Sequence, residues 1–266
     1  TCALPISEWG TVQVFQNTKG RLTSLETAAG ALTGWWNSLA AADLDGDGRL
    51  DLIAGNYGLN TKYHPSPGHP AVIYYGDFDD SGHPQVVEAK TLMDGTLLPV
   101  RGKSCSQAAM PIVRSKFPKF HDFASSDLNG IYTEQKLAGA VRLEAVNLES
   151  AVFWNETPGP GKVALRHQPL PSLAQIAPVF GVTLVDVDGD GDSDVVLAQN
   201  SYSPQRETGN MDGGVSLLLQ NDGARKFSAI WPDRSGIAVA ADAKSLTSVP
   251  LSGTASPSLY FGVNHS

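Results

Sequence analysis

The sequence contains little cysteine, little positive charge and no long apolar run. Its two cysteines, Cys2 and Cys105, allow at most one disulfide, and the sequence leaves open whether they pair or are both free. There are 19 Lys+Arg against 27 Asp+Glu, and no basic run, so we predict no nucleic-acid partner. No apolar stretch approaches the roughly 18 residues of a membrane-spanning helix, so we predict no transmembrane segment.

Familiar catalytic motifs are also missing. The chain has no Gly-x-Ser-x-Gly, no His-Glu-x-x-His, no Cys-x-x-Cys and no phosphate-binding loop. Its six histidines are scattered. We therefore predict no catalytic residues and a protein that is not an enzyme.

What the sequence does have is aspartate at regular spacing. A first loop, residues 43–51, places Asp43, Asp45, Asp47 and Asp51 at positions 1, 3, 5 and 9, with Arg49 at position 7. A second loop, residues 186–194, repeats this phase with Asp186, Asp188, Asp190 and Asp194, and has Asp192 at position 7. Glycine at position 6 of both loops permits a tight turn.

Four carboxylates within nine residues repel one another unless a cation lies among them. An all-oxygen ligand set at this spacing favours Ca²⁺ over Mg²⁺, with position 7 offering its backbone carbonyl. We predict a Ca²⁺ site in each of the two loops. The alternative is an acidic surface turn that holds no ion.

The same spacing occurs in the first half of an EF-hand, but two features argue against one. An EF-hand has a bidentate Glu at position 12, where this chain has Ala54 and Leu197. The flanks are short, apolar and rich in β-branched residues, which indicates buried strands and not helices. We predict calcium loops that each join two strands.

A third loop, residues 77–85, is a weakened copy. Asp77 and Asp79 keep their positions, Ser81 and Gln85 replace two carboxylates, and His83 takes position 7. Because fewer charged ligands bind Ca²⁺ more weakly, this is a possible third site; the alternative is an ordinary turn.

Residues from about 103 to 138 have a helical texture. Phe117, Phe120 and Phe123 recur every three residues among Lys, Asp and Ser, with interruptions at Pro111 and Pro118. We predict an α-helical insertion that covers one side of a β domain. Its basic residues are interpreted as a solvated helix face.

The rest of the chain indicates repeated β units. Residues 182–230 contain a strand, the second loop, a strand, a connection, and a hairpin about Asn221-Asp-Gly223. This is one four-stranded antiparallel blade of about 45–50 residues, as in β-propellers. The last residues repeat the unit in eroded form, with Pro250, Ser252, Thr254 and Ser258 where aspartates belong.

We therefore predict an all-β fold, a partial or few-bladed β-propeller with a helical insert, forming a single domain over residues 1–266. The two ends look like halves of blades. They either complete one blade, giving about four, or belong to a larger propeller of about seven blades.

These units resemble the FG-GAP/VCBS repeats. The segments that carry the resemblance are 35–39 (Trp-Trp-Asn-Ser-Leu), 55–60 (Gly-Asn-Tyr-Gly-Leu-Asn), 98–106, 177–181 and 197–200. Within that group the chain is similar to bacterial cartilage-acidic-protein-like (ASPIC/UnbV-associated) proteins and, more distantly, to integrin α-subunit propellers. The resemblance implies that the aspartates at positions 1, 3, 5 and 9 of the first and second loops are Ca²⁺ ligands.

Two functions follow as hypotheses. The first is a Ca²⁺-stabilised binding or adhesion scaffold that recognises a protein or a glycan through its loops. The second is a secreted hydrolase or lyase that acts on polysaccharide. Since Ca²⁺ sites of this class suit millimolar Ca²⁺, we expect an extracellular or periplasmic protein whose leader has been removed.

Overall fold

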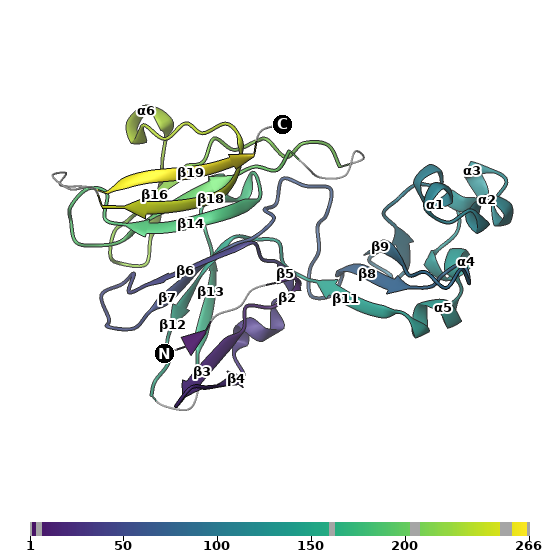
Figure 1. Ribbon diagram of the computed structural model, residues 1–266, viewed down its shortest axis with the longest axis horizontal. Helices are drawn as coiled ribbons and strands as arrows, with labels where there is room; N and C mark the ends of the chain where they lie inside the picture. Colours follow the sequence, from purple (N-terminus) through teal and green to yellow (C-terminus); the bar gives the residue numbers. More distant parts are fainter. Residues whose placement is uncertain (1, 4–6, 160–162, 203–207, 251–256, 265–266) are drawn as a thin grey trace. The chain divides into compact units, whose positions relative to one another are not determined.

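The computed structural model describes residues 2–3, 7–159, 163–202, 208–250 and 257–264, and its secondary structure is mostly antiparallel β (Figure 1). Its contacts divide the chain into two compact units. Unit 1 comprises residues 1–62 and 148–266, and unit 2 comprises residues 63–147. The prediction of a single propeller-type domain stays a prediction.

Unit 1 contains four sheets in succession along the chain, together with a short pairing of β2 (Glu8–Gly10) with β5 (Gly34–Trp35). Sheet I has the order β1-β3-β4, with β1 (Cys2–Ala3), β3 (Val14–Thr18) and β4 (Arg21–Leu25). Sheet II has the order β13-β12-β7-β6, with β6 (Ser38–Ala42), β7 (Asp51–Gly55), β12 (Ala151–Asn155) and β13 (Leu165–Pro169). Both are antiparallel throughout.

Sheet III has the order β14-β15-β16-β17, with β14 (Val179–Val185), β15 (Asp194–Gln199), β16 (Leu217–Asn221) and β17 (Phe227–Ile230). The predicted four-stranded unit over 182–230 is therefore confirmed. Sheet IV is the hairpin of β18 (Asp242–Val249) and β19 (Ser258–Asn264). Most of the eroded loop between them, including Ser252 and Thr254, lies outside the described residues.

Sheet II is buried on both faces because its side chains alternate. Leu52 and Phe153 pack with Trp36 toward sheet I, whereas Ile53 and Trp154 pack with residues of sheet III. Strands β6, β14 and β18, the first strands of sheets II, III and IV, lie next to one another in that order. Short helices complete unit 1: η1 (Ala28–Ala31), η2 (Ser172–Gln175) and α6 (Pro232–Ser235).

Unit 2 is a four-stranded sheet covered by helices. The sheet has the order β10-β9-β8-β11, with β8 (Ala71–Gly76), β9 (Gln85–Thr91), β10 (Leu97–Pro99) and β11 (Val141–Ala145). The helices are α1 (Lys103–Ala109), α2 (Ile112–Lys116), α3 (Phe120–Ala124), α4 (Leu128–Tyr132) and α5 (Glu134–Gly139). Helices were expected over these residues, and their apolar side chains pack on the sheet through one core that includes Phe78, Val87 and Phe123.

Unit 2 is inserted between the second and third strands of sheet II. Strand β7 ends at Gly55, and its partner β12 begins at Ala151, with Ile53 opposite Val152. The hairpin that carries the third loop therefore belongs to the inserted sheet and not to a sheet of unit 1. The insertion is larger than the helical segment that was predicted.

Candidate functional site

The first and second loops each join the first two strands of a sheet. The first loop connects β6 to β7 and the second connects β14 to β15. Strands on both sides agree with the prediction and exclude an EF-hand arrangement.

In each loop three carboxylates converge. Oxygen atoms of Asp43, Asp45 and Asp51 lie within 4.8 Å of one another, and so do those of Asp186, Asp188 and Asp194. Asp51 and Asp194, at position 9, are buried. The two loops thus present the same trio from positions 1, 3 and 9.

Backbone N–H groups hold the first carboxylate of each loop. Gly48 N donates to Asp43 Oδ2 at 2.9 Å, and Gly191 N donates to Asp186 Oδ2 at 3.0 Å. Gly48 and Gly191 have φ of 84° and 98°, a conformation that costs little only for glycine. Glycine at position 6 therefore turns the loop back toward its first aspartate.

The buried carboxylate at position 9 accepts two further N–H groups. In the first loop, Leu44 N donates to Asp51 Oδ2 at 3.1 Å and Asn155 N donates to Asp51 Oδ1 at 2.7 Å. The second loop repeats this with Val187 N and Asn221 N on Asp194, at 3.0 and 2.9 Å. These N–H groups hold the position 9 carboxylate in place without an ion.

Asn155 and Asn221 were not among the predicted site residues. Each ends the third strand of its sheet, and its side-chain amide also donates to the residue before position 9: to Leu50 O at 3.0 Å and to Ser193 O at 3.2 Å. The signal in the sequence was an asparagine after an apolar strand, at Trp154-Asn155 and Gln220-Asn221. Its partner loop lies too far away in sequence for spacing to reveal the pair.

Position 5 lies outside both trios. Asp47 pairs with Arg49 and lies 3.8 Å from the Nη2 of Arg225, whereas Asp190 accepts a hydrogen bond from Asp192 N at 2.9 Å. The Arg49 side chain also donates from Nε to Asn155 O at 2.7 Å. Of the predicted ligands, positions 1, 3 and 9 are brought together, and positions 5 and 7 make contacts within the loop, with Asn155 of the partner strand and, for Asp47, with Arg225.

Burial raises the pKa of Asp51, although the N–H groups of Asn155 and Leu44 oppose this and Asp45 and Asp47 reinforce it. Burial also raises the pKa of Asp194, opposed by Asn221 and Val187 and reinforced by Asp188 and Asp190. Each carboxylate is thus less stable as an anion than an ordinary Asp. A bound cation would reverse this penalty, and three convergent oxygen ligands fit a hard ion such as Ca²⁺.

The third loop has the same turn but different contacts. Gly82 N donates to Asp77 Oδ2 at 2.8 Å, as position 6 does in the other loops, and Gly82 has φ of 77°. Among the described residues, no trio of carboxylate, histidine or cysteine ligands forms here. His83 donates its backbone N–H to Ser81 Oγ at 3.3 Å.

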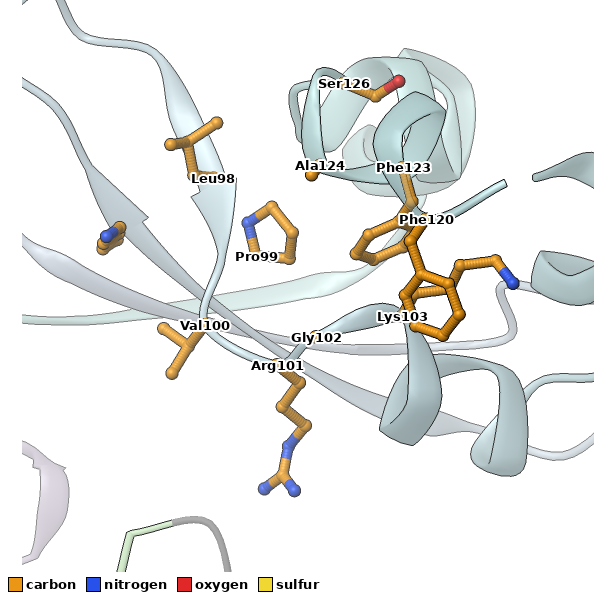
Figure 2. Close-up of a pocket in the computed structure, with 11 residues that line it drawn as sticks. Leu98, Pro99, Val100, Arg101, Gly102, Lys103, Phe120, Phe123, Ala124 and Ser126 are labelled. Carbon is orange, nitrogen blue, oxygen red and sulfur yellow. The ribbon is translucent and has the colours of Figure 1, made fainter. Parts of the chain in front are cut away.

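Unit 2 also contains a pocket of about 340 Å³ between β10 and the helices. Figure 2 shows Pro99 and Phe123 on facing sides, with Phe120 beside Lys103. Lys90, Arg101 and Lys103 line it and no acidic residue does. Lys103 is buried, with its Nζ 3.1 Å from Gln107 Oε1 and 4.6 Å from the centre of the Phe120 ring.

A histidine and a carboxylate with shifted pKa values lie elsewhere. Burial raises the pKa of Glu149 and lowers that of His167, and their Oε2 and Nε2 atoms are 4.0 Å apart. Neither residue lines the pocket of Figure 2 or the polar pocket of about 300 Å³ near Asn60 and Asp212. No helix of the described part of the chain is both long and apolar enough to span a membrane.

Comparison with known proteins identifies one repeat. Residues 3–54 match the FG-GAP-like repeat, a span that contains the first loop and ends within β7. The chain therefore carries an FG-GAP-like repeat, whereas the narrower similarity to cartilage-acidic-protein-like proteins and integrins is not confirmed. No curated protein matches the chain.

Similar solved structures include a rhamnogalacturonan lyase PL11 of Bacillus licheniformis, with 14% identity over 95% of this chain and 48% of that chain, and a TM-score of 0.28. Another is the exotype rhamnogalacturonan lyase YesX, with 12% identity over 95% of this chain and 46% of that chain, and a TM-score of 0.26. This chain spans about half the length of these structures. At such TM-scores the likeness carries no argument about fold or activity.

Proposed function

We propose that this protein is a Ca²⁺-stabilised, non-catalytic binding scaffold built from FG-GAP-like repeats. One ion in the first loop and one in the second would hold the first two strands of sheets II and III together. The observation that carries the proposal is the repeated trio: two separate sheets bring the carboxylates of positions 1, 3 and 9 within 4.8 Å, with position 9 buried.

The ions are proposed to act on structure. Each trio gathers negative charge that repels itself, so the metal-free loop is strained and the ion-bound loop is not. The first loop is also tied to the neighbouring sheet, because Asn221 Nδ2 donates to Leu44 O at 2.7 Å. An ion in the first loop would therefore stabilise the packing of sheet II on sheet III as well as its own hairpin.

A partial propeller is the arrangement we propose for unit 1. Its sheets follow one another along the chain, and β6, β14 and β18 lie side by side as the inner strands of consecutive blades would. A blade buried on both faces, as sheet II is, needs a neighbour on each side. In this proposal unit 2 is an insertion within one blade of a propeller-type domain.

The scaffold is proposed to bind an extracellular or periplasmic protein or glycan. The pocket of unit 2 is a candidate contact point, since Lys90, Arg101 and Lys103 line it, although Arg101 also lies 3.7 Å from Glu88 Oε2, and Phe120 is 62% exposed. Such a pocket would suit an anionic group attached to an apolar or sugar face.

Thermal unfolding with and without Ca²⁺ tests the proposal. We expect the Tm to fall by several degrees in EGTA and to recover on adding excess Ca²⁺ but not on adding Mg²⁺. The variants Asp43→Ala and Asp186→Ala should each lose part of that response. If EGTA leaves the Tm unchanged and calorimetry detects no heat of Ca²⁺ binding, the proposed structural role of the ion is wrong.

The non-catalytic part of the proposal has its own test. Neither of the two pockets described above is lined by the histidine and carboxylate with shifted pKa values. We expect no release of reducing ends or of unsaturated sugars from acidic and neutral polysaccharides in the presence of Ca²⁺. Turnover that is lost in both Glu149→Gln and His167→Ala variants would instead support a polysaccharide-acting enzyme.

A further inference from the structure

The third loop differs from the other two at position 9. Where they have the buried carboxylates of Asp51 and Asp194, this loop has the side-chain amide of Gln85. In all three loops, one atom of the position 9 side chain accepts the backbone N–H of position 2: Phe78 N donates to Gln85 Oε1 at 2.8 Å.

That contact fixes the orientation of the amide. A backbone N–H can only donate, so the Gln85 atom facing Phe78 is the oxygen and the other atom is the NH₂ group. The NH₂ group then donates to Asp79 Oδ1 at 2.7 Å and to Ser81 Oγ at 3.2 Å. Asp79 and Ser81 hold positions 3 and 5, from which a calcium loop would offer oxygen atoms to the ion.

A second donor group, and a charged one, reaches the loop from helix α5. Lys136 Nζ donates to Asp77 O at 3.1 Å and pairs with the carboxylate of Asp80. Asp80 has φ of 59° and takes position 4, where the first and second loops have Gly46 and Gly189. The other two loops also have an outside donor, Arg225 on Asp45 and Gln220 on Asp188, so what sets the third loop apart is the amide at position 9 in place of a buried carboxylate.

The negative charge of Asp79 is stabilised by hydrogen bonds within the loop. Hydrogen bonds from Ser81 and Gln85 outweigh burial and lower the pKa of Asp79. The carboxylate of the third loop is therefore stabilised as an anion by the protein itself. An ion would have to displace the Gln85 NH₂ group to reach Asp79 Oδ1.

We propose that the third loop is a cation-independent closure, in which the amide of Gln85 and the ammonium of Lys136 replace the ion. The possible third Ca²⁺ site at Asp77, Asp79, Ser81, His83 and Gln85 is therefore not a Ca²⁺ site. Unit 2 keeps its fold when Ca²⁺ is removed, whereas the first and second loops of unit 1 respond to it.

Hydrogen–deuterium exchange of the full chain in Ca²⁺ and in EGTA tests this. Peptides covering residues 43–55 and 186–199 should exchange at least about tenfold faster in EGTA, whereas a peptide covering residues 76–91 should be unchanged. Calorimetric titration should count two ions per chain, one for each trio. A third ion, or Ca²⁺-dependent protection of residues 76–91, would overturn the proposal.

Variants of Gln85 distinguish the hydrogen bonds of its side-chain amide from the packing of its side chain. Gln85→Glu keeps the side-chain length but replaces the NH₂ donor by a charged oxygen, so residues 76–91 should lose protection in EGTA and regain it in Ca²⁺. Gln85→Ala should lose protection in both. Lys136→Met should weaken protection in both by a smaller amount, since it leaves the Gln85 contacts intact. A Gln85→Glu loop as protected in EGTA as wild type would contradict the role of the amide.

These outcomes are distinct from failure of the proposed function. If the first and second loops bind no Ca²⁺, their peptides will not respond to EGTA and the titration will count no ion. The Gln85→Ala and Lys136→Met variants still test the closure of the third loop in that case, because both losses are expected without Ca²⁺.

Discussion

Arg225, in the turn between β16 and β17, donates from Nε to Asp45 Oδ2 of the first loop at 2.6 Å, although the two residues lie far apart in sequence. Its guanidinium also donates to Glu156 at 2.9 Å and lies 5.2 Å from the centre of the Trp154 ring. A turn of sheet III therefore contacts a candidate Ca²⁺ ligand in the first loop of sheet II.

Arg225→Ala should lower the free energy of unfolding by about 1–3 kcal/mol, because it removes charge-assisted hydrogen bonds and leaves the half-buried Asp45 without its cation. The loss should be greater in EGTA than in Ca²⁺, where an ion compensates. Urea denaturation in both conditions measures this. Arg234→Ala on the exposed helix α6 is the matched control and should change little. Equal losses for both variants would contradict a specific role for Arg225.

Asp51→Asn and Asp194→Asn should each abolish Ca²⁺ binding at one loop. Without Ca²⁺ each should still cost about 1–3 kcal/mol, because both carboxylate oxygens accept a backbone N–H and the NH₂ group of Asn can accept neither. With Ca²⁺ at about 100 times the dissociation constant, each should lose about 2.7 kcal/mol of ion-derived stability.

Position 5 provides the comparison for these variants. Asp47→Asn and Asp190→Asn change residues outside the trios and should lower Ca²⁺ affinity less than the position 9 variants do. Calorimetric titration of all four variants distinguishes a trio of ligands from a set of four. Equal losses at positions 5 and 9 would show that position 5 moves in to bind the ion.

The two sites should differ in affinity. Arg49 and Arg225 neutralise part of the charge in the first loop, whereas in the described residues no basic side chain lies within 4.0 Å of the second-loop carboxylates. Since affinity rises with ligand charge, we expect the second loop to bind Ca²⁺ about tenfold more tightly. Titration of Asp51→Asn, which leaves the second loop, against Asp194→Asn, which leaves the first, measures each site alone. The reverse order would exclude this charge argument.

The free energy of unfolding should fall at low pH, in part because Asp242 becomes protonated. Burial alone would raise its pKa, but hydrogen bonds from Lys244, Asn264 and Tyr202 N outweigh burial and hold the pKa below the ordinary 3.8. A lowered carboxylate pKa stabilises the fold above pH 3.8, and this contribution disappears as the pH falls through the folded-state value. In EGTA, Asp242→Asn should therefore lose less stability between pH 7 and pH 3 than wild type. Asp233→Asn on exposed helix α6 is the control and should behave as wild type.

The packing of sheet II on sheet III should depend on Trp154. This side chain is fully buried and stacks on Phe227 with ring centres 6.0 Å apart. Trp154→Ala should lower the free energy of unfolding by about 3–5 kcal/mol, because it leaves a large cavity between the sheets. Trp231→Ala, at a side chain that is 61% exposed, should cost far less. Similar losses would mean that the two sheets do not depend on this contact.

The sequence alone determined the local features of this protein. Apolar runs bounded by glycine and aspartate predicted the hairpins around the first, second and third loops. The spacing of Asp186, Asp188, Asp190 and Asp194 predicted four convergent carboxylates, of which those of Asp186, Asp188 and Asp194 converge. Phenylalanines at three-residue steps predicted the helices of unit 2. These features are local because hydrogen bonds and side-chain directions within about ten residues decide them.

Only the tertiary structure decided which distant segments meet. Ile53 pairs with Val152 although all of unit 2 lies between them in sequence, and this strand pairing places Asn155 next to Asp51. Strand partners are selected by burial of both sheet faces and not by any local pattern. The role of Gln85 was likewise hidden in the sequence. Its amide donates to Asp79 because its oxygen meets the N–H of Phe78, a choice that depends on the folded geometry of the loop.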